Sequence, residues 1–90
     1  MGINYFQGQL VGPFKAEEEL FDKIKENSAI DVNYVSHLGV QTDISNYIFI
    51  NEKEVEVGKT GIYEIGNTEI TSIKFKQDVD KNTIIDYTIN

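Results

Sequence analysis

The sequence predicts a mainly β fold of the α+β class: a small antiparallel β-sandwich or sheet of six to seven strands, with one N-terminal helix over about residues 14–26. Isoleucine occurs 13 times and valine 7 times, against 3 leucines, and β-branched side chains pack better in strands than in helices. From residue 30 onward, apolar and polar residues alternate in short segments separated by turn residues. Because the connections between these segments are short, we expect neighbouring strands to pair antiparallel.

The chain of 90 residues is long enough for one domain and too short for two. Within this single domain, residues 1–90, we expect an N-terminal arm or strand over residues 1–13, a helix over residues 14–27 and a β domain over residues 30–90. The sequence contains no linker, low-complexity segment or clear internal repeat that would divide the domain further.

The helix is predicted by an apolar face and by the charges near its start. Ala16, Leu20 and Ile24 recur every four residues, which places them on one side of a helix. Pro13 suits a helix start, and the glutamates at 17–19 lie where the positive end of the helix dipole stabilises acidic side chains. We interpret this glutamate run as a solvent-exposed helix start rather than as an acidic binding site.

The first strands of the β domain are predicted over residues 30–40 and 47–50. One face of the first segment carries Ile30, Val32, Tyr34, Ser36, Leu38 and Val40. The run at residues 47–50 is apolar on both faces, which predicts a central strand. Residues 51–54 suit a turn and the alternation resumes at residue 55, so this part of the chain predicts a β-hairpin.

Three further strands are predicted in the last third of the chain. A short strand over residues 62–65 is followed by a tight turn at Gly66-Asn67-Thr68, because glycine and asparagine tolerate positive φ. One face of the next strand carries Thr71, Ile73 and Phe75. After a loop over residues 77–83, the last strand spans residues 84–89. Its apolar face carries Ile85, Tyr87 and Ile89.

Composition and charge exclude several classes of protein. The chain has no cysteine, which excludes a disulfide scaffold, a zinc finger and a cysteine protease. The net charge is −7, with eight lysines and no arginine, and the charges are spread evenly, so we expect no nucleic-acid partner. We also expect no membrane partner, because no apolar run reaches about 18 residues and the first ten residues do not form a signal peptide.

Two short motifs are interpreted as turns rather than as binding sites. Gly58-Lys59-Thr60-Gly61 contains the Gly-Lys-Thr end of a phosphate-binding loop, but Lys53 stands where that motif requires its first glycine. Asp78-Val79-Asp80-Lys81-Asn82 spaces three oxygen ligands as a calcium loop does, but Thr83 and Ile89 replace the required glycine and glutamate. We expect no cofactor and no metal, and the sequence leaves open whether the loop at residues 78–82 binds an ion.

No set of residues converges on a catalytic role. His37 is the only histidine, and it lies opposite the apolar positions of its strand, so it should face solvent or a partner. The sequence has no Gly-x-Ser-x-Gly motif, and alternating carboxylates such as Glu54 and Glu56 suit the solvent-exposed face of a strand. We therefore expect no catalytic residues and a protein that is not an enzyme.

Apolar residues crowd the N-terminal part of the chain. The candidate subunit contacts among them are Tyr5, Phe6, Leu10, Val11 and Phe14. If the chain's own core leaves them uncovered, this segment could pair with the sheet edge of another subunit. The simpler alternative is an ordinary edge strand that closes the core of its own chain.

Residues 38–89 resemble a module found in phage and prophage proteins of low-GC Gram-positive bacteria. The matching segments are Leu38-Gly39-Val40-Gln41, Tyr47-Ile48-Phe49-Ile50-Asn51, Val55-Glu56-Val57-Gly58-Lys59-Thr60-Gly61-Ile62-Tyr63-Glu64-Ile65, Ile70-Thr71-Ser72-Ile73-Lys74-Phe75 and Ile84-Ile85-Asp86-Tyr87. The most specific part is residues 58–64, and residues 1–37 lie outside the resemblance. Thr42-Asp43-Ile44-Ser45 stands where the module usually has a loop with proline or glycine.

The resemblance implies a non-enzymatic bacteriophage virion structural protein, either head-decorating or part of the tail or baseplate, that docks on neighbouring virion subunits. Its partners would be other virion proteins or copies of itself. Its location would be the virion, after synthesis in the bacterial host cytoplasm. Two alternatives stay open: a prophage-encoded inhibitor of a host protein, and a carbohydrate- or receptor-binding module of a phage particle. The tyrosines available to stack on sugars are Tyr34, Tyr47, Tyr63 and Tyr87.

Overall fold

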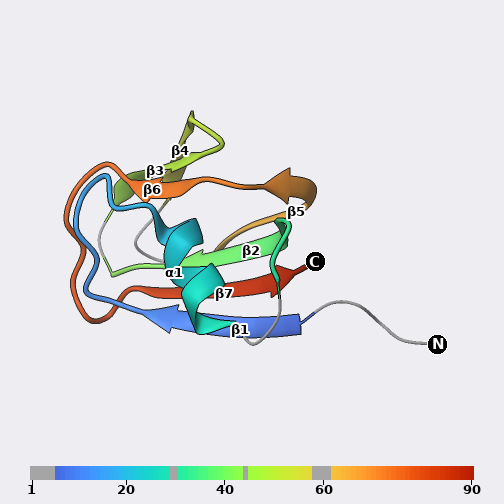
Figure 1. Ribbon diagram of the computed structural model, residues 1–90. Coiled ribbons are helices and arrows are strands. Elements are labelled where there is room, and N and C mark those ends of the chain that lie inside the picture. Colours follow the sequence, from blue (N-terminus) through green and yellow to red (C-terminus); the bar gives the residue numbers. More distant parts are fainter. Residues whose placement is uncertain (1–5, 29–30, 44, 58–61) are drawn as a thin grey trace.

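The computed structural model describes residues 6–28, 31–43, 45–57 and 62–90, which form two antiparallel sheets and one short helix (Figure 1). Sheet A has the strand order β1-β7-β2-β5, with β1 at Phe6–Val11, β7 at Ile84–Ile89, β2 at Val35–Gln41 and β5 at Ile62–Ile70. Sheet B has the order β4-β3-β6, with β4 at Lys53–Val57, β3 at Asn46–Ile50 and β6 at Ile73–Phe75. The arrangement confirms the predicted fold class, a small β-sandwich with one helix.

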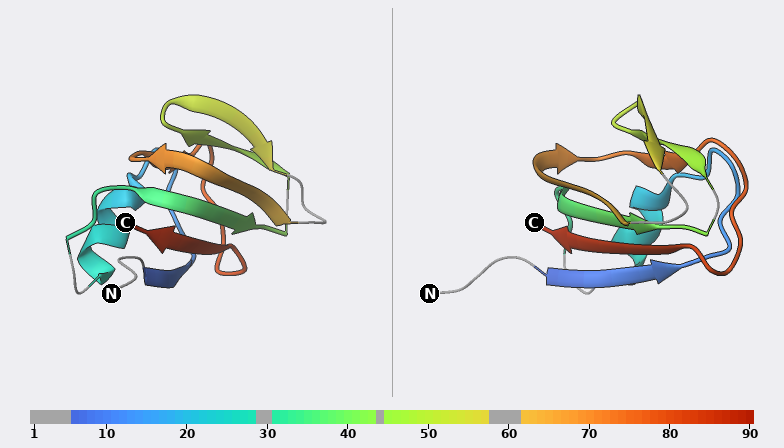
Figure 2. Two further views of the ribbon diagram at one scale, coloured as in Figure 1. Left: turned by 90° about the vertical axis from the view of Figure 1, so that its right-hand side faces the viewer. Right: turned by 180° about the vertical axis from the view of Figure 1, so that it is seen from behind.

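The helix, α1 at Leu20–Asn27, lies against the inner face of sheet A, which sheet B also covers (Figures 1 and 2). Leu20, Phe21 and Ile24 are its buried residues, and they join the same core as the two sheets. At the C-terminal end of α1, the Asn27 Nδ2 donates to the Tyr87 hydroxyl of β7 over 3.1 Å. This contact holds the end of the helix over the boundary between β7 and β1.

Strand alternation sets the inner face of sheet A. Ile85, Tyr87 and Ile89 of β7 are 0%, 4% and 2% exposed, which confirms the predicted apolar face of the last strand. β3 lies in the centre of sheet B with Ile48 and Ile50 buried, as its apolar sequence predicts. The buried side chains of both sheets therefore meet in one core, which gives the domain its stability.

The predicted hairpin is confirmed as β3 and β4, joined by the two-residue turn Asn51-Glu52. Both residues have positive φ, at 51° and 68°, which is the backbone of a type I′ turn. The Asn51 Oδ1 accepts from the backbone N–H groups of Thr71 and Ser72 over 2.8 and 3.2 Å, while its Nδ2 donates to the Glu69 carbonyl over 2.9 Å. Asn51 thus ties the hairpin to the connection between β5 and β6.

The helix is shorter than predicted, because residues 14–19 are extended or turn rather than helical. Phe14 and Val79 exchange backbone hydrogen bonds of 3.2 and 2.9 Å, and the Phe14 ring stacks on Phe75 with centroids 6.2 Å apart. Glu17 has a φ of 63°, outside the helical region, and its N–H donates to the Phe75 carbonyl over 2.9 Å. Pairing with distant strands therefore overrides the local helical pattern.

Glu19 marks the true start of α1 and also joins the helix to sheet B. It is the N-cap residue, and its carboxylate accepts from the Phe21 N–H over 3.4 Å. The same carboxylate accepts from the Ser72 hydroxyl and from the Ile73 N–H, each over 2.7 Å. The glutamate run therefore includes a structural residue, and the prediction of a fully solvated run is wrong at this position.

The predicted turn at Gly66-Asn67-Thr68 is also wrong, because β5 continues through it to Ile70. In the pairing of β2 with β5, Val35 lies opposite Ile70 and His37 lies opposite Gly66. The stretch of β5 between these two pairs is longer than the stretch of β2, so the residues predicted to form a turn lie in a β-bulge instead. A second register shift changes the phase of β2: Val35 lies opposite Ile89 of β7 and His37 opposite Thr88, so β2 carries one residue more than β7 at this point. Val35, Leu38 and Val40 are fully buried, whereas the predicted alternation placed Tyr34 and Ser36 in the core.

Candidate functional site

β1 is an edge strand of sheet A and the part of this domain best placed to meet another chain. It pairs antiparallel with β7 from Phe6 opposite Ile89 to Val11 opposite Ile84, and no other described strand lies on its second side. An edge strand presents backbone N–H and C=O groups that a further strand can pair with. Figure 2 shows the outer side of β1 open at the margin of the sheet.

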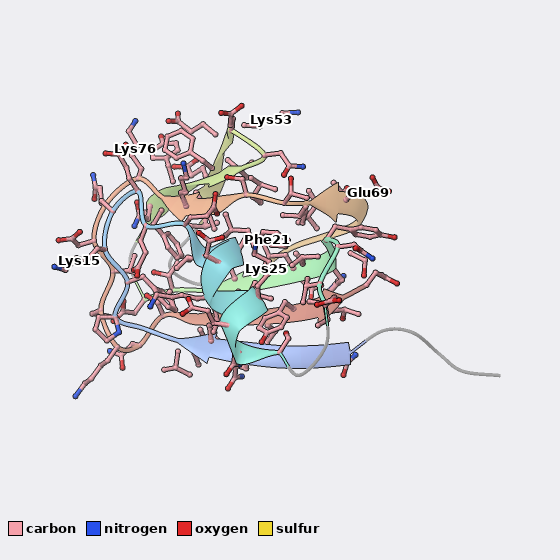
Figure 3. All side chains as sticks on the ribbon, viewed as in Figure 1. Lys15, Phe21, Lys25, Lys53, Glu69 and Lys76 are labelled. Carbon is pink, nitrogen blue, oxygen red and sulfur yellow. The ribbon has the colours of Figure 1, made fainter. Side chains whose placement is uncertain are left out.

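The other open edges carry charges, and β1 carries none. β1 reads FQGQLV, while β4 reads KEVEV and β5 contains Glu64 and Glu69. Lys53 of β4 and Glu69 of β5 project outward from those strands in Figure 3. The edge of β6 is covered, because Glu17 and Glu19 bond to its backbone. Charged side chains discourage edge-to-edge pairing, so β1 is the edge in the described residues most open to it.

A groove runs beside the C-terminal half of β1, between that strand and α1. It consists of two adjoining hollows of about 380 Å³ each, which share Pro13, Phe14 and Lys23. The first is lined by Leu10, Val11, Gly12, Pro13, Phe14, Lys23, Glu26 and Asn27. The second is lined by Pro13, Phe14, Lys15, Glu18, Lys23, Asp78 and Val79. We call these two hollows the β1 groove.

Charges of both signs line the α1 side of the β1 groove. Lys23 pairs with Glu18 over 3.1 Å, and the Glu18 carboxylate also accepts from the Lys15 backbone N–H over 3.2 Å. This backbone hydrogen bond, together with the Lys23 ammonium, holds the pKa of Glu18 below its ordinary value. Glu26 makes no ion pair with any residue that the structure describes. The groove thus has apolar residues at its floor and charged residues of both signs along its α1 side, of which Lys23 and Glu18 are paired with each other.

Three of the five predicted subunit contacts meet at this groove. Val11 is 54% exposed, Leu10 is half-buried against the core, and Phe14 forms part of the floor. Phe14 is only 4% exposed and belongs to the core of its own chain, so its predicted role as a surface contact is corrected. Tyr5 and the side chain of Phe6 lie outside the described residues.

The residues on the α1 side of the groove were missed by sequence reasoning. Lys23, Glu26 and Asn27 lie on the helix, and their distance in sequence from β1 gives no signal that they border it. A helical pattern indicates which face of α1 is polar, but not which strand lies next to that face. Only the packing of α1 against sheet A brings the two sides together.

The outer face of sheet A carries a further hollow of about 220 Å³. It is lined by Gln7, Gly8, His37, Asp86, Tyr87 and Thr88. His37 is exposed here, as its position opposite the apolar residues predicts. The Asp86 carboxylate accepts from the Gln9 Nε2 over 2.9 Å, and within the described parts of the chain no hydrogen bond joins His37 to a carboxylate or hydroxyl.

The remaining sequence motifs contribute no assembled site. Gly58-Lys59-Thr60-Gly61 lies outside the described residues. In the acidic loop, Asp80 Oδ1 accepts from the Asn82 N–H over 2.9 Å, as in a polar turn. Asp78 Oδ1 accepts from the Ala16 N–H over 2.7 Å and so joins the loop to the segment before α1. In the ranges that the structure covers, no three acidic, histidine or cysteine side chains are grouped to hold a metal ion.

The tyrosines are dispersed rather than gathered on one surface. Tyr87 is buried, Tyr34 is half-buried, and the side chain of Tyr63 lies outside the description. Tyr47 is 38% exposed, with the Lys76 ammonium 5.1 Å from its ring centroid. A platform of several rings that could stack on a sugar is therefore not present among the described tyrosines.

No described helix has the length and apolar character needed to cross a membrane. Neither a family model nor a curated protein nor a solved structure matches this chain.

Proposed function

We propose that this chain is a non-enzymatic structural protein of bacteriophage particles, either head-decorating or part of the tail or baseplate, that docks on neighbouring subunits through β1 and the β1 groove. The observation that carries the docking proposal is the uncharged, open edge of β1 beside a groove that is lined by apolar residues on the β1 side and by charged residues on the α1 side. Strand addition at such an edge uses backbone hydrogen bonds for affinity and side-chain pockets for specificity. The phage setting is supported by the resemblance of residues 38–89 to phage and prophage proteins.

The mode of docking that fits this geometry is an extended segment laid along β1. A strand added there would continue sheet A, and its side chains on the inner face would point toward α1 and the groove. Val11 lies at the end of β1 and is the most exposed large apolar side chain among the described residues, at 54%. Covering this side chain would contribute free energy to docking.

The first test is whether the chain is part of phage particles. Particles are purified by density gradient from the lysate of a host that encodes the chain, and their proteins are quantified by mass spectrometry. We expect the chain at a fixed number of copies per particle, because structural subunits repeat by symmetry. Its absence from purified particles would overturn the proposed function.

The second test places a charge at the groove. Val11→Asp should reduce incorporation into particles, because a carboxylate would have to be desolvated under the docked strand. Val11 is exposed, so the variant should keep the stability of the parent protein. Gln77→Asp adds the same charge in the exposed loop after β6 and should leave incorporation unchanged. Equal incorporation of both variants would count against docking at β1.

A further inference from the structure

We infer that two copies of this chain pair with each other through β1, antiparallel and about a two-fold axis, so that their two A sheets become one continuous sheet. This inference rests on the proposed function and names its partner as a second copy of the chain. An isologous contact of this kind brings the same strand from both copies together. The strand must therefore be chemically complementary to itself, and three features of β1 meet that condition.

The first feature is charge. The chain has a net charge of −7, so two copies repel each other over most of their surfaces. β1 contains no charged residue, whereas β4 and β5 carry charges that would face like charges if either edge paired with itself. Among the described edges, β1 is where two copies approach with the least repulsion. A basic partner would gain nothing from this uncharged strand and would favour the acidic surfaces instead.

The second feature is the pair of glutamines on the outer face of β1. Gln7 and Gln9 are both exposed, and each carboxamide offers donors and an acceptor, so a glutamine row can bond to a copy of itself. Gln9 uses one N–H for Asp86, and Gln7 makes no side-chain hydrogen bond within the described residues. We expect one of the two antiparallel registers in which Gln9 lies opposite Gln9 or Gln7 of the second copy, because amide then meets amide.

The third feature is the apolar end of the strand. Val11 is 54% exposed at the mouth of the β1 groove, whose lining includes Leu10, Pro13 and Phe14. A second copy running along β1 would cover this end in each subunit, because the two-fold axis repeats every contact. β1 has six residues, so the contact is small. We therefore expect a reversible dimer whose fraction rises with protein concentration.

The inference is tested by sedimentation velocity of the full chain over a range of concentrations. Gln7→Lys combined with Gln9→Lys places like charges opposite each other in either register and should weaken the dimer about tenfold or more. Gln41→Lys combined with Gln77→Lys makes the same change of charge at exposed positions away from the β1 edge and should leave the dimer intact. Equal effects of the two pairs of substitutions would overturn pairing through β1.

A complementary experiment uses the absence of cysteine from the chain, which makes introduced cysteines the only thiols. Opposed strand residues lie about 4.5–5.5 Å apart at Cα, within the range that a disulfide spans. Mild oxidation should cross-link Gln9→Cys with itself, or an equimolar mixture of Gln7→Cys and Gln9→Cys, according to the register. Gln77→Cys is the control, and cross-linking no greater than this control in both cases would contradict the inference.

The outcomes separate the inference from the proposed function. If the chain is monomeric at every concentration but is found in particles, self-pairing is wrong and docking on a different subunit remains. If the dimer forms as described but the chain is absent from particles, the proposed function is wrong and the self-pairing stands.

Discussion

At the scale of single residues, the contact between Gly8 and Tyr87 shows why β1 belongs to the fold of its own chain. Gly8 and Tyr87 are register partners, and the tyrosine ring covers the glycine. A Cβ at Gly8 would lie 2.5 Å from the Tyr87 Cζ, closer than real contacts allow. The ring is 4% exposed, and its hydroxyl accepts from Asn27. The absence of a side chain at Gly8 therefore lets β1, β7 and α1 meet.

We predict that Gly8→Ala lowers the free energy of unfolding by about 1–3 kcal/mol, because the buried ring must move and loses its bond to Asn27. The measurement is urea unfolding followed by circular dichroism. Gly66→Ala is the matched control, since its Cβ would lie 3.1 Å from Nδ1 of the exposed His37 ring, which can rotate away. The control should change stability by about 0.5 kcal/mol or less. Equal losses would contradict the role assigned to Tyr87.

Glu19 and Glu17 show how neighbouring residues of one type take different roles. The Glu19 carboxylate caps α1 and bonds to Ser72 and Ile73, while the Glu17 backbone at positive φ bonds to Phe75. Sequence composition presents them as one acidic run. The difference between them comes from the position of β6, which supplies the partners of both residues.

At the scale of elements, the segment before α1 illustrates the competition between local and distant partners. Residues 14–19 have a helical pattern, yet Phe14 pairs with Val79 and stacks on Phe75 in the core. Burial of an aromatic ring contributes several times the free energy that helix propensity does per residue. The helix therefore begins only at Leu20, because the contacts of Phe14 with Val79 and Phe75 hold the preceding segment in a non-helical conformation.

The β3–β4 hairpin gives a prediction at this scale. Its turn places Glu52 at a φ of 68°, where residues with a Cβ are strained by about 1–2 kcal/mol. Glu52→Gly should raise the free energy of unfolding by about 0.5–1 kcal/mol, since part of the relieved strain is offset by the entropy of glycine in the unfolded chain. Thermal unfolding monitored by circular dichroism measures the change.

The control for the hairpin is Lys53→Gly, one residue further along the chain. Lys53 is the first residue of β4, and its φ does not lie in the positive region. Glycine there should weaken the strand and lower the melting temperature. If both substitutions destabilise the protein equally, the turn assignment at Asn51-Glu52 is wrong.

At the scale of the whole molecule, β1 both covers part of the hydrophobic core and forms an open edge of sheet A. It pairs with β7 along its whole length, and Leu10 packs against the core, as the simpler alternative of an edge strand requires. Its second side has no partner strand in the described chain, as an assembly contact requires. The two sequence-based alternatives for this segment are therefore compatible.

Removal of residues 1–13 should consequently destabilise the whole domain. The deletion removes every pair between β1 and β7 and uncovers Tyr87. We expect a lower unfolding midpoint in urea and the loss of dispersed amide resonances in nuclear magnetic resonance spectra. Gln7→Lys combined with Gln9→Lys keeps the strand and should retain the native spectrum. A truncated chain with unchanged stability would show that β1 is a detachable arm.

The candidate site could be predicted only in part. The apolar residues Leu10, Val11 and Phe14 stand out in sequence because they crowd a segment with few charges. Their division into exposed, half-buried and buried residues depends on where β7 and α1 lie, and so does the presence of Lys23 and Glu26 across the groove. The sequence therefore indicates the candidate residues on the N-terminal segment, but it does not indicate those on α1.

The sequence by itself determined the mainly β class, the central position of β3 and the inward face of β7, because composition and two-residue alternation depend only on neighbouring residues. The tertiary structure decided where α1 begins, that β5 runs through Gly66, and that β1 borders a groove beside α1. These features arise from pairs such as Phe14 with Val79 and Gly8 with Tyr87. Their energies depend on residues far apart in the chain, which no local pattern records.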